Sequence, residues 1–153
     1  MKLLMLTPRF PYPPTRGDAV RACGELEYLA ARHDVWLASL ADAPPPPAAL
    51  DHVRQRCREV AVVSCAPRRA LLRGALTLAR GGSLMAGYFA DARLTRVLDG
   101  WAAQVGFDAV LTFSAALAPL AARVPAARRV LDMNDVDSLK WRRYAATVPV
   151  PLR

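Results

Sequence analysis

The chain has 153 residues, of which 54% are hydrophobic, enough to form the core of one domain. Its formal net charge is +8, and all but two of its 21 basic residues are arginine. A basic chain can attract phosphates, anionic lipids or nucleic acids, but the arginines are scattered, so we do not expect a nucleic-acid partner. The longest uncharged run, residues 109–122, is shorter than the ~20 residues that span a bilayer.

The three cysteines, Cys23, Cys57 and Cys65, are odd in number and show no C-x-x-C spacing. This pattern favours free thiols in a reducing compartment. The apolar stretch near Met1 is too short for the core of a secretory signal, and prolines follow it at once. We therefore expect a cytoplasmic location, with attachment to the inner face of the cytoplasmic membrane as the alternative.

Short apolar runs with the length of buried strands recur along the chain, at residues 2–6, 35–40, 59–63, 109–113 and 129–132. Segments with apolar residues at helical spacing lie between and after them, at residues 18–32, 48–58, 68–80, 91–105, 115–123 and 136–146. This alternation predicts an α/β fold with a parallel sheet, flanking helices and right-handed crossovers. A ligand would then bind at the carboxyl ends of the strands.

The first strand-to-helix turn has an unusual composition. Its prolines, from Pro8 to Pro14, exclude a regular element, and the loop closes on Gly17. Asp18 would be a suitable N-cap of the helix that follows. A glycine lets a ligand approach the backbone, and a helix start offers free N–H groups and the positive end of a dipole to a phosphate. The alternative is an ordinary rigid turn, because one glycine is a weaker signal than G-x-G-x-x-G.

The segment of residues 66–80 is basic and amphipathic. Leu71, Leu72 and Leu76 fall on one side of the predicted helix, with arginines around them. Such a helix can lie on an anionic membrane surface, so the sequence leaves peripheral membrane contact open. A helix that packs its apolar side on the sheet explains the pattern equally well.

A polar segment follows the last predicted strand and places Asn134 and Asp135 at the ligand edge of the sheet. A carboxylate there can act as a general base toward a sugar hydroxyl or orient the acceptor. The alternative is helix capping, for which Asp135, Asp137 and Ser138 are all suited. Asp135 and Asp137 also match the D-x-D pattern of metal-dependent sugar transferases, but such short matches are frequent, and we expect no metal site.

Ser114 also follows a strand and is therefore a candidate for substrate binding. Nothing in the sequence identifies a base for it, so we do not expect it to be a nucleophile. His33 and His52 are isolated and have no Cys or His partner at metal-ligand spacing.

Two segments of the chain resemble a known family. The first is MKLLMLTPRFPYPPTRGDAVRACGELEYLAARHDVWLASLAD and the second FDAVLTFSAALAPLA…RRVLDMNDVDSLKWRRYA. Both resemble the amino-terminal domain of family 4 glycosyltransferases with the GT-B fold. The runs PRFPYPP and DVDSLKWRRYA are similar to those of sugar transferases associated with the PEP-CTERM/exosortase system of Gram-negative bacteria.

The resemblance implies half of a GT-B enzyme, in which two Rossmann-like domains enclose the active site. This half would hold the acceptor and the other half the nucleotide sugar, with retaining transfer and no cofactor or essential metal beyond that donor. Gly17 matches the glycine whose amide approaches the donor diphosphate, and Asp135 falls near the catalytic position of the cleft. Arg16 and Asn134 stand where the family often has Gly and His.

We therefore expect residues 1–153 to form one acceptor-side domain and the nucleotide-sugar domain to be absent. Its signature, two glutamates separated by seven residues, cannot occur because Glu25, Glu27 and Glu59 are the only glutamates. The expected function is sugar transfer from a nucleotide sugar to a glycan or lipid-linked acceptor in envelope or exopolysaccharide assembly, inactive without the missing half. The alternative is a stand-alone Rossmann-like binding module without catalysis.

Overall fold

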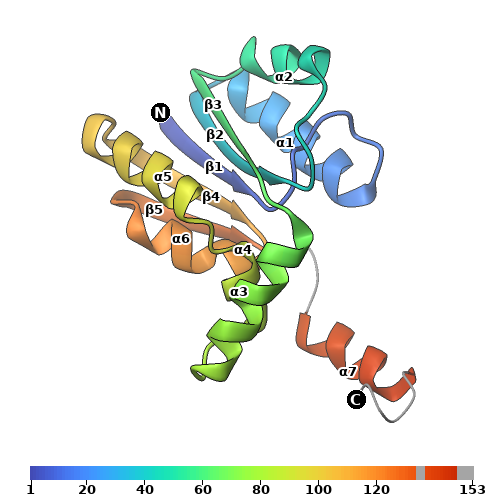
Figure 1. The fold of residues 1–153 in the computed structure, drawn as a ribbon. Helices are drawn as coiled ribbons and strands as arrows, with labels where there is room; N and C mark the ends of the chain where they lie inside the picture. The colour runs from blue at the N-terminus through green and yellow to red at the C-terminus, as the bar shows by residue number, and fades with distance from the viewer. Residues whose placement is uncertain (134–136, 148–153) are drawn as a thin grey trace.

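A computed structural model describes residues 1–133 and 137–147. Its centre is a five-stranded sheet of order β3-β2-β1-β4-β5 in which all neighbours are parallel (Figure 1). The strands are β1 (Lys2–Thr7), β2 (Asp34–Ala41), β3 (Glu59–Ser64), β4 (Phe107–Phe113) and β5 (Ala126–Asp132). The predicted parallel α/β fold is confirmed, and its strand order is Rossmann-like.

Helices cover both faces of the sheet (Figure 1). One face carries α1 (Gly17–Ala30) and α2 (Pro47–Arg54). The other carries α5 (Ala92–Gln104), the 3₁₀ turn η1 (Ala115–Leu117) and α6 (Ala118–Arg123). A hairpin of α3 (Pro67–Ala79) and α4 (Leu84–Phe89) lies beyond the carboxyl edge, and α7 (Asp137–Thr147) lies apart from the sheet.

The sheet divides the hydrophobic core into two layers. Leu4 of β1 belongs to the layer that contains Leu98 of α5, whereas Met5 belongs to the layer that contains Leu26 of α1. Because β1 alternates between these layers, both of its faces are buried, and Leu4, Met5 and Leu6 have no exposed surface. The continuous apolar run in the sequence is the signature of this central position.

Glu59, the first residue of β3, satisfies two indole groups at the amino-terminal end of the sheet. The Trp101 Nε1–H donates to its carboxylate at 2.8 Å and the Trp36 Nε1–H at 3.4 Å. Both tryptophans are only 9% exposed, so their N–H groups need such an acceptor. The contact ties α5 to β2 and β3.

Several element boundaries differ from the predictions. Helix α1 begins at Gly17 with Arg16 as its N-cap, so Asp18 lies inside the first turn and is not the cap. Helix α4 was not predicted, because six residues are too few to show a helical period. The predicted helix at residues 115–123 is divided into η1 and α6.

Asp91 joins the α3–α4 hairpin to the sheet. Its carboxylate caps α5 by accepting from the Arg93 N–H at 2.9 Å, and it lies 3.0 Å from the Arg93 guanidinium and 3.6 Å from that of Arg73. Arg93 also donates to the Ser64 carbonyl at the end of β3, at 2.7 Å. The hydrogen bonds from Arg93 hold the pKa of Asp91 at about 2, against the opposing effect of burial.

The two leucines Leu98 and Leu72 provide a matched test of the fold. Leu98 is fully buried, so Leu98→Ala should lower the free energy of unfolding by about 2–5 kcal/mol. Leu72 is 62% exposed, so Leu72→Ala should change it by less than about 0.5 kcal/mol. Urea denaturation followed by circular dichroism measures both values. Equal losses would contradict the positions of α5 and α3.

The low pKa of Asp91 predicts a pH dependence of stability. An ionised Asp91 stabilises the fold above its unfolded pKa of 3.8, and this contribution is lost as the pH falls toward 2. We expect Asp91→Asn to lower the free energy of unfolding near neutral pH by about 2 kcal/mol, and the difference from wild type to shrink in acid. Denaturation curves from neutral pH down to about pH 3 measure this difference. A pH-independent difference would mean that the ion pairs contribute nothing.

Candidate functional site

The candidate site lies at the carboxyl edge of the sheet, where the central strand β1 ends. The chain leaves β1 toward α1 on one face and leaves β4 toward η1 on the other (Figure 1). Such a divergence leaves a crevice beyond the strand ends. Beside it lies a cavity of about 450 Å³, lined by residues 41–46 after β2 and, after β1, by Arg9, Phe10, Tyr12, Pro13, Thr15, Arg16, Asp18 and Ala19. We call it the edge cavity.

The Pro-rich loop over this cavity is held by aromatic stacking. The Tyr12 ring lies on the His52 imidazole of α2 with the ring centres 3.8 Å apart and the planes within 15°. His52 Nε2 is in turn 3.6 Å from a carboxylate oxygen of Glu27 in α1. His52 therefore has a stacking partner that its sequence spacing did not reveal, and the stack fixes the loop to α2.

Two arginines line the edge cavity and differ in their pairing. Arg9 donates to the Asp18 carboxylate at 2.8 Å. Burial alone would raise the pKa of Asp18, but the hydrogen bonds from Arg9 and from the Ala19 backbone, with the Arg9 charge, hold it below its ordinary value. Arg16 is exposed, and its side chain makes no hydrogen bond or ion pair with any described residue. Its charge is available to an anion in the cavity.

Gly17 leaves the helix start open. Its φ lies outside the left-handed region, and an added Cβ would meet nothing within 4 Å, so the fold itself does not require glycine here. The first hydrogen bond of α1 runs from Val20 N–H to the Arg16 carbonyl, which leaves the Gly17 N–H without an intrahelical acceptor. An anion can approach this N–H at the positive end of the helix dipole.

Ser114 has a local structural role at the end of β4. Its φ is +74°, a conformation that costs a non-glycine residue roughly 1–3 kcal/mol. The hydroxyl accepts from the Ala116 N–H at 3.4 Å and so caps η1, while the Ser114 N–H donates to the Asp132 carbonyl at 3.0 Å. Ser114 is not among the residues that line the edge cavity.

The polar residues at and after the end of β5 in the sequence differ in whether the structure describes them. Asn134 and Asp135 lie outside the described residues, so their predicted roles stay predictions. Asp132, which sequence reasoning did not select, accepts from Arg21 of α1 at 2.8 Å, and its second carboxylate oxygen is buried without a hydrogen bond among the described residues. No periodic signal could have revealed this pair, because the two residues are 111 positions apart.

No cluster of three or more His, Cys, Asp or Glu side chains that could hold a metal occurs within residues 1–133 and 137–147. The three cysteines are unpaired, and Cys23 is buried while Cys57 and Cys65 are half-buried.

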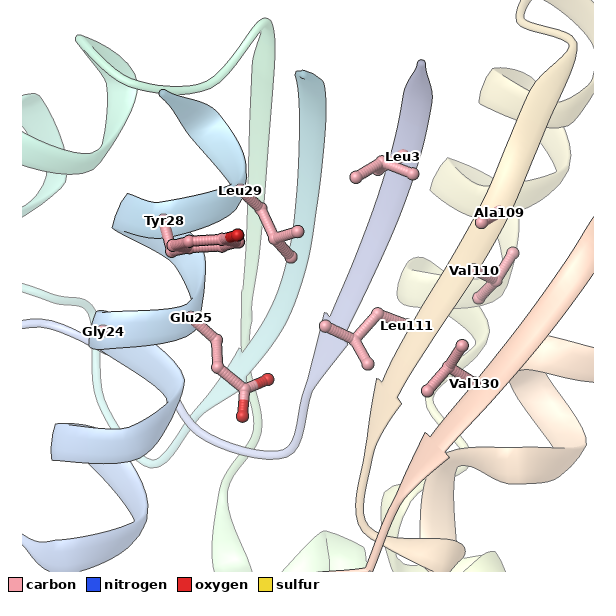
Figure 2. Close-up of a pocket in the computed structure, with 9 residues that line it drawn as sticks. All are labelled: Leu3, Gly24, Glu25, Tyr28, Leu29, Ala109, Val110, Leu111 and Val130. Atoms are coloured by element: carbon pink, nitrogen blue, oxygen red, sulfur yellow. The ribbon is translucent and has the colours of Figure 1, made fainter. Parts of the chain in front are cut away.

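A second cavity, of about 430 Å³, lies on the α1 face of the sheet. The strands form the floor of this cavity, with Leu3, Leu111 and Val130 (Figure 2). Helix α1 forms its wall, with Tyr28 and Leu29. It forms because α1 and α2 pack over β1 to β3 and leave the β4–β5 side uncovered on this face, where Val130 is 53% exposed. Its walls are apolar except for Glu25, so it does not suit a phosphate.

Comparisons with known protein families, with curated proteins and with solved structures find no match for this chain. None of the helices in the described part of the chain is both long enough and apolar enough to cross a membrane.

The Arg9–Asp18 pair can be tested by titration. Arg9→Met should raise the pKa of Asp18, because burial would then act without the opposing hydrogen bond and charge. An NMR pH titration of the Asp18 carboxyl carbon measures the shift. Arg32→Met is the control, since Arg32 contacts Tyr28 and should leave Asp18 unchanged. An Asp18 pKa that does not respond to Arg9→Met would show that the pair is not formed in solution.

Proposed function

We propose that this chain is the acceptor-side half of a retaining sugar transferase that uses a nucleotide sugar. The observation that carries the proposal is the open start of α1, where the Arg16 side chain, unpaired among the described residues, lines the edge cavity and the free N–H of Gly17 comes next in the chain. A diphosphate is the part of a nucleotide sugar that such a site would bind. The resemblance of the Pro-rich loop and of the DVDSLKWRRYA run to family 4 glycosyltransferases supports the same interpretation.

The edge cavity has the chemistry of a carbohydrate site. Phe10 and Tyr12 supply aromatic surface, and Thr15 and Asp42 supply groups that can hydrogen-bond to sugar hydroxyls. The Tyr12–His52 stack and the Arg9–Asp18 ion pair hold the loop that carries them, so the cavity is preorganised. In this proposal the acceptor lies in the edge cavity and the donor diphosphate lies against Gly17.

Asp135 is the candidate for orienting the acceptor hydroxyl or accepting its proton, with Asn134 and Ser114 beside the same edge as candidate substrate contacts. The alternative function is a binding module that holds the same diphosphate and catalyses no transfer. Transfer and binding are therefore measured separately.

Gly17→Val tests the diphosphate contact. The fold has room for the side chain, so the substitution acts on a ligand that approaches the Gly17 N–H and not on the backbone. We expect it to weaken binding of UDP, GDP or inorganic pyrophosphate by about tenfold or more, equivalent to roughly 1.4 kcal/mol. NMR titration of the chain, followed at the amides of the first turn of α1, measures the dissociation constant.

Gly24→Val is the matched control. Gly24 lies in the same helix, an added Cβ also meets nothing within 4 Å, and the helix loses the same flexible residue. It should leave nucleotide binding unchanged. If Gly17→Val binds as tightly as Gly24→Val, the Pro-rich loop is only a rigid connector and the proposal is wrong.

Sugar transfer is measured with radiolabelled UDP- and GDP-sugars. We expect residues 1–153 alone to give no turnover above the buffer blank, because this chain supplies only the acceptor side in our proposal. Turnover would contradict the division of the enzyme into two halves. Nucleotide binding without turnover, when the chain is joined to a nucleotide-sugar domain, would instead favour the binding module.

A further inference from the structure

The apolar side of α3 faces away from the rest of the protein. The exposed fractions are 57% for Leu71, 62% for Leu72, 49% for Leu76 and 54% for Leu78. The side of α3 that faces inward carries small residues instead, including Ala70 and Gly74, which are buried. The leucines therefore do not pack on the sheet, which removes one of the two explanations that the sequence left open.

Close backbone packing explains this orientation. A Cβ at Gly74 would lie 2.8 Å from the Leu84 carbonyl oxygen, and a Cβ at Gly87 would overlap the Thr77 side chain. The α3 and α4 backbones can come this close only because both positions are glycine. The hairpin is thus held together by small residues, and its leucines are not needed to fold it.

The inward arginine and the outward arginines of α3 differ in their partners. Arg73 donates to the Tyr88 carbonyl at 3.0 Å and lies 3.6 Å from Asp91, which anchors the hairpin to the body. Arg68, Arg69 and Arg80 are exposed, and their side chains form no hydrogen bond or ion pair with any part of the chain that the structure describes. No acidic residue occurs between residues 66 and 90, so nothing on the hairpin neutralises them.

We propose that the outer side of α3, formed by these four leucines and three arginines, docks on an anionic lipid surface. Leucines that enter the boundary between headgroups and acyl chains, flanked by arginines that bind lipid phosphates, are the features of an interfacial helix. The hairpin projects beyond the carboxyl edge of the sheet (Figure 1).

Charge favours a lipid surface over a second copy of the chain. A two-fold contact through this face would bring identical unpaired arginines together without an acid on either hairpin. A bilayer containing anionic lipid offers both the apolar phase and the negative charge. The proposal does not depend on the sugar-transfer function.

Vesicle co-sedimentation of the 153-residue chain tests the proposal. We expect binding to vesicles of equimolar phosphatidylcholine and phosphatidylglycerol, and binding weaker by about tenfold or more to phosphatidylcholine alone or at high salt. Leu71→Ser/Leu72→Ser should weaken binding to the anionic vesicles by about tenfold or more, because both leucines would leave the apolar phase. Arg68→Gln/Arg69→Gln should do the same by removing two phosphate contacts.

Two control variants are matched to these changes. Arg96→Gln/Arg128→Gln removes the same charge from exposed arginines outside the hairpin that form no ion pair with a described residue. Val130→Ser/Leu131→Ser removes exposed apolar side chains from β5. Both controls should bind as the wild type does, and circular dichroism verifies that every variant is folded.

Three outcomes would overturn the proposal. Equal binding to neutral and anionic vesicles would show that the arginines have no role. Equal binding by the α3 variants and their controls would place the contact elsewhere. Absence of vesicle binding, together with a sedimentation coefficient that falls only in the leucine variant, would show that this side of α3 is an interface between protein chains.

Discussion

Burial of β1 on both faces is the constraint on which the rest of the structure depends. Leu4, Met5 and Leu6 lose all contact with water, so helices must cover the sheet on either side of this strand. The chain meets that demand by running from β1 over one face and returning to β4 over the other. The loops after β1 and β4 then diverge, and the edge cavity lies beside the point of divergence.

The edge cavity combines a fixed loop with free charge. Stacking of Tyr12 on His52 and the Arg9–Asp18 ion pair hold the loop, and neither contact uses Arg16 or the Gly17 N–H. A site for an anion needs both properties, because an ordered loop avoids the entropy cost of closing on the ligand and an unpaired cation has no internal partner to lose. The proposed function rests on this arrangement.

In the α3–α4 hairpin, α3 is oriented in the opposite way to an ordinary amphipathic helix, which buries its large apolar side chains. Its small residues face inward and its leucines outward, because the glycines permit a backbone contact that side chains as large as leucine would prevent. Four leucines about half exposed are unfavourable in water, at roughly 25 cal/mol for each Å² of apolar surface. In our proposal, an apolar phase at the membrane boundary removes that cost.

The sequence by itself determined the alternation of strands and helices, the buried strand near the N-terminus and the helix that starts beside Gly17, because each depends on local composition and period. It also identified the apolar side of α3. Tertiary structure decided what that side faces, since the contact at Gly74 depends on α4, a helix too short to show a period. Tertiary structure likewise decided the strand order, the stacking of Tyr12 on His52 and the pairing of Arg21 with Asp132. Each of these joins residues far apart in the chain, and no periodic pattern records which distant segments meet.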